Sequence, residues 1–129
     1  MTTSDLDMTL QEHIETALVF LEQSRQELAA GDILQGCEKL WGAAAHATMA
    51  YAQHRGWPYG DHPSLKQTAT RLSRATGDTS LRLQFGIAEK FHANYYHSFM
   101  QDYELENDPP EVHEFVKKMV SITQSPSKE

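Results

Sequence analysis

The chain has 129 residues, of which 40% are hydrophobic and 22% are charged, a length that suits one compact domain and excludes a multidomain enzyme. The 11 Lys and Arg residues against 18 Asp and Glu give a formal net charge of −7, so a broad basic face for nucleic acid is not expected. The single cysteine cannot form an intramolecular disulfide, and the sequence has neither a signal peptide nor a long apolar stretch. We therefore expect a cytoplasmic protein that does not enter the membrane.

The first helix is predicted over residues 10–29, after a flexible N-terminus over 1–8. Thr9 and Glu12 have the spacing of a capping box, and Gly31 supplies a stop signal. The apolar residues that recur at helical spacing are Leu10, Ile14, Leu18, Leu21 and Leu28.

The second helix is predicted to begin after Asp32, a suitable N-cap, and to end before Gly56. Its middle, residues 41–50, carries no formal charge on any face and is rich in small side chains. A helix of this kind belongs in the middle of a bundle, where it contacts several neighbours. A turn-rich connection over 56–63 leads to a shorter third helix, which is marked by Leu65, Ala69 and Leu72.

The fourth helix is predicted to be long, with a regular series of inward positions at Leu81, Phe85, Ala88, His92, Tyr95 and Phe99. A polar, acidic linker follows it. Asp108 then caps a fifth helix, with prolines in its first turn and Glu111 at the third helical position. Residues 124–129 are expected to be a disordered tail. The predicted fold is all-α, an up-and-down antiparallel bundle of four long helices plus a shorter one over residues 9–123.

The polar residues on these inward faces are the first candidates for a site. Glu89 and His92 lie one turn apart, and Glu38 on the second helix is expected to meet His92. One interpretation is an interior polar network of Glu38, His46, Glu89, His92 and Asn94 that fixes the register of the helices. The alternative is a metal site formed by Glu38, His46, Glu89 and His92.

A second set of candidates lies in residues 91–97 and in the loop before the third helix. His92 and His97 are side chains suited to acid and base chemistry near neutral pH, with Asn94 between them and Tyr96 beside them. The loop residues Trp57, Tyr59 and His62 are interpreted as a lid over one end of the bundle, or as a surface that stacks on a base or a partner side chain. Cys37 lies in an apolar series and is expected to be a packing residue.

Three segments carry a resemblance to a known family. They are Gly31-Asp32-x3-Gly36-x-Glu38-Lys39-Leu40-Trp41-Gly42-Ala43-Ala44-Ala45-His46, followed by Arg55-Gly56-Trp57-Pro58 and His62, and then Ala88-Glu89-x2-His92-Ala93-Asn94-Tyr95-Tyr96. Over residues 10–120 the sequence resembles the PaREP family of small prokaryotic proteins. That family is similar in turn to the HEPN (higher eukaryotes and prokaryotes nucleotide-binding) superfamily. The resemblance implies an up-and-down bundle, often dimeric, in a superfamily that includes RNA-cleaving toxins and partners of minimal nucleotidyltransferases.

The chain departs from the pattern of the active HEPN ribonucleases, which carry Arg-x4-6-His in a late helix and bring two copies together across a dimer. Arg55 and His62 have this spacing, but they span a loop that contains Pro and Gly. In the fourth helix the nearest equivalent is His92 with His97, where an imidazole replaces the guanidinium. The loss of that permanently charged fork weakens phosphate positioning.

The residues and the resemblance together predict a HEPN-like binding or partner module that needs no cofactor, and they favour a non-enzymatic role without deciding between it and an enzymatic one. The resemblance adds a homodimer and a cognate partner such as a minimal nucleotidyltransferase or an antitoxin, while nucleic-acid binding stays open. The expected binding residues are Glu38, Lys39, Trp41, His46, Trp57, His62, Glu89 and Tyr96. The two alternatives are the metal-binding bundle and a toxin-type ribonuclease that uses His92, His97 and Asn94 across a dimer.

Overall fold

The computed structural model describes residues 7–125, and the regular structure in this part of the chain is helical. The helices are α1 (Leu10–Ala29), α2 (Ile33–Arg55), α3 (His62–Thr76), α4 (Ser80–His97), α5 (Asp102–Asn107) and α6 (Pro109–Gln124). Most of the flexible N-terminus predicted over 1–8, and of the tail predicted over 124–129, lies outside the described residues. Within residues 7–125, no helix has both the length and the hydropathy needed to cross a membrane.

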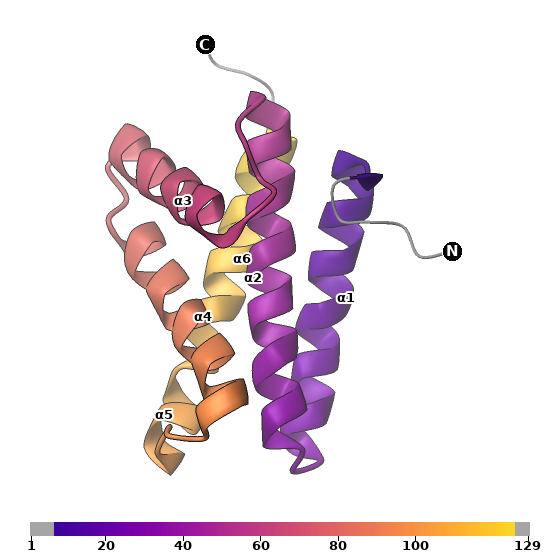
Figure 1. Ribbon diagram of the computed structural model, residues 1–129, viewed down its shortest axis with the longest axis vertical. Helices are drawn as coiled ribbons and strands as arrows, with labels where there is room; N and C mark the ends of the chain where they lie inside the picture. Colours follow the sequence, from indigo (N-terminus) through magenta and orange to yellow (C-terminus); the bar gives the residue numbers. More distant parts are fainter. Residues whose placement is uncertain (1–6, 126–129) are drawn as a thin grey trace.

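The four longest helices of the bundle are α1, α2, α4 and α6. Each of them runs antiparallel to the one before it in this series (Figure 1). The shorter α3 lies across one end of the bundle, between the end of α2 and the start of α4. This arrangement confirms the predicted all-α bundle of four long helices plus a shorter one. The structure adds a further short helix, α5, which the sequence analysis read as a linker.

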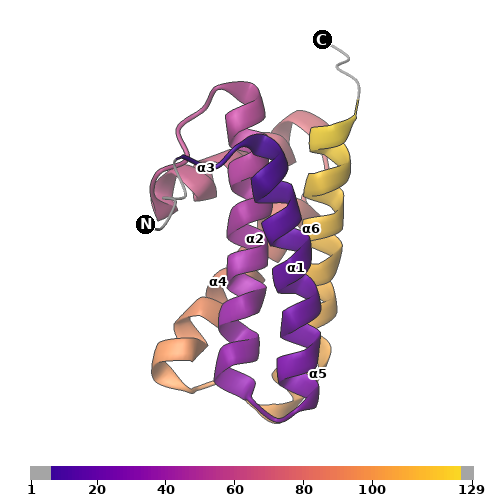
Figure 2. The same cartoon turned by 90° about the vertical axis from the view of Figure 1, so that its right-hand side faces the viewer.

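Helix α2 is the centre of the bundle and contacts α1, α3, α4 and α6. Figure 2 shows α1 running along α2, in front of α2 and α6, which contact each other. The small side chains of α2 permit this close approach: a Cβ added at Gly36 would lie 2.5 Å from Cδ2 of Leu28 on α1. The predicted central place of this helix is therefore confirmed.

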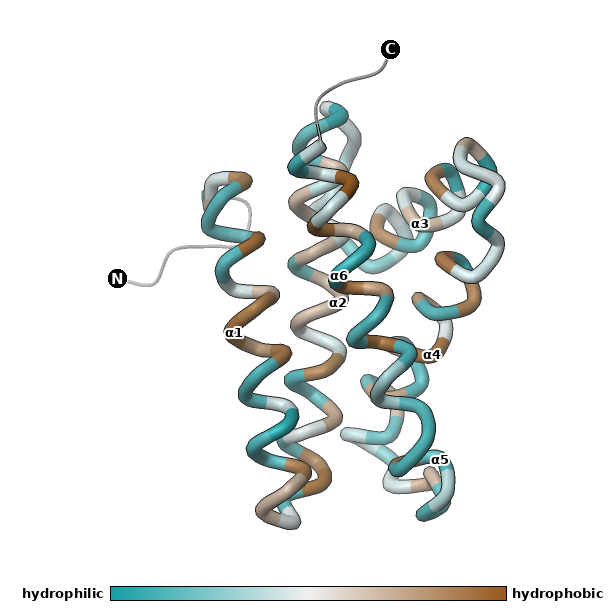
Figure 3. Tube along the Cα trace, turned by 180° about the vertical axis from the view of Figure 1, so that it is seen from behind, coloured by the Kyte–Doolittle hydropathy of each residue, from teal (hydrophilic) through white to brown (hydrophobic). Residues whose placement is uncertain are grey.

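The core is built from the inward faces of amphipathic helices, and hydrophobic and hydrophilic residues alternate along α1 and α6 in Figure 3. The largest fully buried side chains include three rings that come from two helices, and these are Phe85 and Phe91 on α4 and Phe115 on α6. Phe85 touches Phe115 on one side and Trp41 of α2 on another, with ring centroids 6.0 and 5.7 Å apart. These aromatic contacts pack α2, α4 and α6 against one another.

Helix α4 ends at His97, two residues earlier than the series of inward positions predicted. Ser98 adopts a left-handed conformation with φ 50°, and the Met100 backbone N–H donates to Oδ1 of Asn94 over 2.7 Å. This hydrogen bond turns the chain back, so Met100 is buried while Phe99 is 45% exposed. The expected core position of Phe99 is therefore wrong, because a side-chain hydrogen bond ends the helix before it.

The acidic segment after this turn forms α5 instead of an unstructured linker. The Gln101 backbone N–H donates to the Glu104 carboxylate over 2.8 Å, which caps the helix. Lys90 of α4 forms ion pairs with Glu104 at 3.0 Å and Asp108 at 2.7 Å. These two carboxylates raise the pKa of Lys90 against the opposing effect of its burial. The ion pairs hold α5 against α4.

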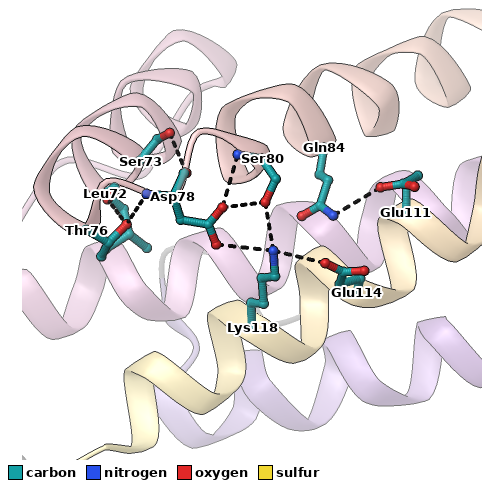
Figure 4. Close-up of polar contacts among 9 residues, drawn as sticks. All are labelled: Leu72, Ser73, Thr76, Asp78, Ser80, Gln84, Glu111, Glu114 and Lys118. Carbon is teal, nitrogen blue, oxygen red and sulfur yellow. Dashed lines mark hydrogen bonds and ion pairs between the residues drawn. The ribbon is translucent and has the colours of Figure 1, made fainter.

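A polar cluster fixes the connection between α3 and α4 onto α6 (Figure 4). Lys118 of α6 donates to Asp78 at 3.2 Å and to the Ser80 hydroxyl at 2.8 Å, and it forms an ion pair with Glu114 at 3.0 Å. Ser80 also donates to the Asp78 carboxylate from its hydroxyl and its backbone N–H. These bonds hold the pKa of Asp78 below its ordinary range, with Ser80 as the largest cause and Lys118 as the second.

We expect Lys118→Met to destabilise the protein at neutral pH, because the carboxylates of Asp78 and Glu114 then face each other without their shared cation. A carboxyl whose pKa is lowered on folding contributes stability above its unfolded-state pKa, and that stability is lost as the pH falls through the folded-state value. The difference in the free energy of unfolding between wild type and variant should therefore become smaller below about pH 4. Urea unfolding at pH 7 and pH 3 measures it, with the exposed Lys117→Met as the control. An equal difference at both pH values would contradict the assignment.

Candidate functional site

Five side chains from three helices meet on the solvent side of the contact between α2 and α4. Glu38 and Trp41 lie one turn apart on α2, and Glu89 and His92 lie one turn apart on α4. His62 is the first residue of α3. We call this set, Glu38, Trp41, His62, Glu89 and His92, the histidine–carboxylate site.

The contact between His92 and Glu38 that the sequence predicted is confirmed. Nδ1 of His92 lies 3.1 Å from Oε1 of Glu38. The side chain of His92 is 29% exposed and that of Glu38 is 35% exposed. The pair is therefore half-buried at the edge of the bundle and open to solvent. A half-open pair of this kind can meet a ligand, whereas a fully buried pair would only fix the packing of the helices.

The structure adds a second imidazole–carboxylate pair beside the first. Nε2 of His62 lies 2.8 Å from Oε2 of Glu89, and the Lys66 ammonium lies 3.6 Å from the same carboxylate oxygen. His62 owes its place to the start of α3, where Asp61 accepts a hydrogen bond from the Ser64 backbone N–H over 2.9 Å. Ser64 holds the pKa of Asp61 below its ordinary range, so this carboxylate is ionised at neutral pH.

Trp41 joins the two pairs. Its ring centroid lies 5.0 Å from that of His92, with the planes nearly parallel at 27°, and 4.8 Å from that of His62. The two imidazole centroids are 6.3 Å apart. Tyr96 covers His92 edge-on from the outside and is itself 65% exposed. Each imidazole therefore has one nitrogen engaged by a carboxylate and one face held by the same indole.

A hollow of about 350 Å³ opens beside Trp41, between α2, α3 and the loop that precedes α3. Its polar wall contains Glu38, His46, Asp61, His62 and His92, and its apolar wall contains Ala45, Met49 and Leu65. Among the described residues that line it there is no Lys or Arg. When a carboxylate accepts the N–H of one ring nitrogen, the other nitrogen of a neutral imidazole is a hydrogen-bond acceptor. When both rings are neutral, the hollow thus presents acceptors and negative charge.

His46, which the sequence placed in the same network, has a different partner. Its Nδ1 lies 3.0 Å from Nδ1 of His13 on α1, and both rings are buried. His13 was not among the predicted site residues, although its spacing with Ala17 and Leu21 places it on the inward face of α1. The expected single network is therefore divided, because α1 and not α4 faces His46.

The predicted metal set is not brought together by the fold. Within residues 7–125, no group of three or more His, Cys, Asp or Glu side chains has the geometry to hold a metal ion. Two of the four proposed ligands are bound as a pair, Glu38 with His92, while His46 is turned toward His13 and Glu89 toward His62. The metal-binding alternative therefore has no preformed set of ligands among the described residues.

Two further residues of the predicted catalytic strip lie apart from His92. Asn94 is 2% exposed; besides accepting from Met100, it donates to the Cys37 sulfur over 3.5 Å. Burial raises the pKa of the Cys37 thiol, in keeping with its predicted packing role. His97 is the exposed last residue of α4, about 140° around the helix from His92 at 100° per residue. The fold brings His62, and not His97 or Asn94, next to His92.

Lys39 and Trp57, two further predicted binding residues, do not line the hollow. The Lys39 ammonium lies 4.6 Å from the centre of the Phe20 ring on α1. Trp57 packs against Tyr51 near the end of α2, with the guanidinium groups of Arg55 and Arg71 within 5.0 Å of its ring. The sequence grouped Trp57 with His62 as one lid, whereas the structure places His62 in the histidine–carboxylate site.

The fold and this site define an all-helical bundle protein with a half-open hollow that is lined by imidazole and carboxylate groups. The model of the archaeal PaREP1/PaREP8 family matches residues 12–116. The chain belongs to this family, as its resemblance to PaREP proteins predicted. The similarity to HEPN proteins stays a prediction, with which an all-helical bundle is consistent.

Comparison with solved structures supports the fold. A crystal structure of a protein from Sulfolobus solfataricus is similar over 82% of this chain and 94% of that chain, with a TM-score of 0.72 and 20% sequence identity. A likeness at this identity concerns the fold alone. The search of curated proteins found no match. The function therefore has to be argued from the site.

Proposed function

We propose that this PaREP1/PaREP8 family protein is a binding module and that the histidine–carboxylate site and its hollow form the recognition site. One observation carries the proposal: Trp41, Glu38, His62 and His92 line a half-open hollow instead of being packed into the core, and Glu89 holds His62 from behind. Polar groups that converge on a partly apolar hollow are typical of small-ligand sites. The predicted homodimer and protein partner stay predictions.

The ribonuclease alternative has weaker support from the same geometry. Two imidazoles 6.3 Å apart suit proton transfer, but the described lining has two carboxylates and no Lys or Arg to hold a phosphate or to stabilise the charge of a transition state. Incubation with single-stranded RNA tests this alternative. RNA cleavage that His92→Ala or His62→Ala abolishes, in protein with an unchanged circular dichroism spectrum, would replace the binding proposal.

The binding proposal is tested with Trp57→Phe protein, in which Trp41 is the one remaining tryptophan and its fluorescence reports on the site. The probe is a panel of soluble fragments that contains equal numbers of cations, neutral molecules and anions. We expect saturable changes in Trp41 fluorescence that are lost when His62→Ala is added. His97→Ala is the matched control and should bind as before, because His97 lies outside the site. A panel that gives no saturable change, or binding that survives His62→Ala, would contradict the proposal.

A further inference from the structure

We infer that the hollow takes a small organic cation, an ammonium, amidinium or guanidinium group carried on an apolar body. The inference rests on the proposed function and names the ligand class of the same site. It is drawn from the charges, the hydrogen-bonding atoms and the volume of the hollow.

The charges around the hollow are one-sided. Glu38 and Asp61 line it, and Glu89 lies behind His62. The Lys66 ammonium forms an ion pair with Glu89 at 3.6 Å, but Lys66 does not line the hollow. An anion would therefore meet carboxylates with no permanent cation beside it, whereas an organic cation would meet its counter-charge. The formal net charge of −7 favours the approach of a cation from solution.

The hydrogen-bonding atoms point to the same class of ligand. Nδ1 of His92 and Nε2 of His62 are each held by a carboxylate, which leaves Nε2 of His92 and Nδ1 of His62 as acceptors when the rings are neutral. Glu38 engages His92 through Oε1, and its second oxygen is a further acceptor. Ammonium and guanidinium groups carry several N–H donors and no acceptor, so they complement such a wall.

The apolar wall and the volume limit the body of the ligand. Ala45, Met49 and Leu65 form an aliphatic surface, and a methionine adapts to different shapes. The Trp41 ring already stacks with His92 and contacts His62, so the body of the ligand meets the aliphatic side of the hollow. About 350 Å³ lies near the lower end of the range for small-molecule pockets. A monoamine with a short chain or one ring fits this description better than a long polyamine.

Three probes with the same aromatic body separate charge from shape: 2-phenylethylammonium, 2-phenylethanol and phenylacetate. Isothermal titration of the full chain should give binding of the ammonium probe at least about tenfold tighter than either of the others, as expected for one charge-assisted hydrogen bond. Glu38→Gln should weaken the ammonium probe by a similar factor. Glu15→Gln removes the same charge from the exposed face of α1 and should leave the affinity unchanged.

The outcomes separate this inference from the proposed function. Tighter binding of phenylacetate or phenylethanol that depends on His62 would overturn the cation assignment and leave the binding site in place. Equal losses in Glu38→Gln and Glu15→Gln would show a general charge effect and would also overturn it. If none of the three probes binds and the fragment panel also fails, both the inference and the proposed function are contradicted.

Discussion

Phe85→Ala should lower the free energy of unfolding by about 3–5 kcal/mol, because it removes a fully buried ring and leaves a cavity that the surrounding helices fill only in part. Phe85 contacts Trp41, His62 and Phe115, so the cavity would open between the core and the histidine–carboxylate site. For a chain of this length the melting temperature should fall by roughly 10–20 °C.

Chemical denaturation of wild type and variant measures this effect. Leu83→Ala is the matched control, since Leu83 lies on the same helix but is 66% exposed, and its loss should change stability by less than about 0.5 kcal/mol. If Phe85→Ala costs no more than Leu83→Ala, the aromatic contacts of Phe85 are not packed as described.

Asn94→Ala should cost about 2–4 kcal/mol, from an unsatisfied buried donor together with a small cavity. The Met100 N–H loses its acceptor at 2.7 Å, and the Cys37 sulfur loses the amide donor. The turn that ends α4 should then loosen, and the Met100 amide should exchange its hydrogen faster than in the wild type.

The exposed Asn107→Ala serves as the control for this substitution. The result also separates a structural role for Asn94 from the catalytic role that the sequence suggested. A stable Asn94→Ala protein with slow exchange at Met100 but altered binding or RNA cleavage would return Asn94 to the functional residues.

The long helices could be predicted because their apolar spacing, caps and stops agree with one another. Thr9 and Glu12 form the predicted capping box, and Gly56 takes the left-handed conformation that ends α2. Helix α5 was not predicted, because its cap uses Gln101 in place of the usual Ser or Thr and its stability depends on the distant Lys90. The sequence pattern of a short segment does not show which distant residue will contact it in the folded chain.

Helical spacing also predicted part of the candidate site. Glu38 and His92 lie on the facing sides of two helices whose periodicity is clear, so their contact followed from spacing. His62 follows a turn-rich loop, and helical spacing does not fix where such a loop delivers the next residue. The pairing of His62 with Glu89 therefore came only from the structure. His46 was assigned to the wrong partner because the sequence does not show which neighbour of α2 it faces.

The central claim is that Trp41 and the two imidazole–carboxylate pairs act as one site, and nuclear magnetic resonance of the histidine rings and the Trp41 indole tests it most directly. We expect Glu38→Gln to shift the His92 and Trp41 signals, and Glu89→Gln to shift those of His62 and Trp41, with the buried His13 unchanged. Added 2-phenylethylammonium should then move the His62, His92 and Trp41 signals together with a single dissociation constant. The account would be contradicted if neither substitution shifted the ring signals of His62 and His92. It would also be contradicted if the probe shifted these signals no more than it shifts those of His13.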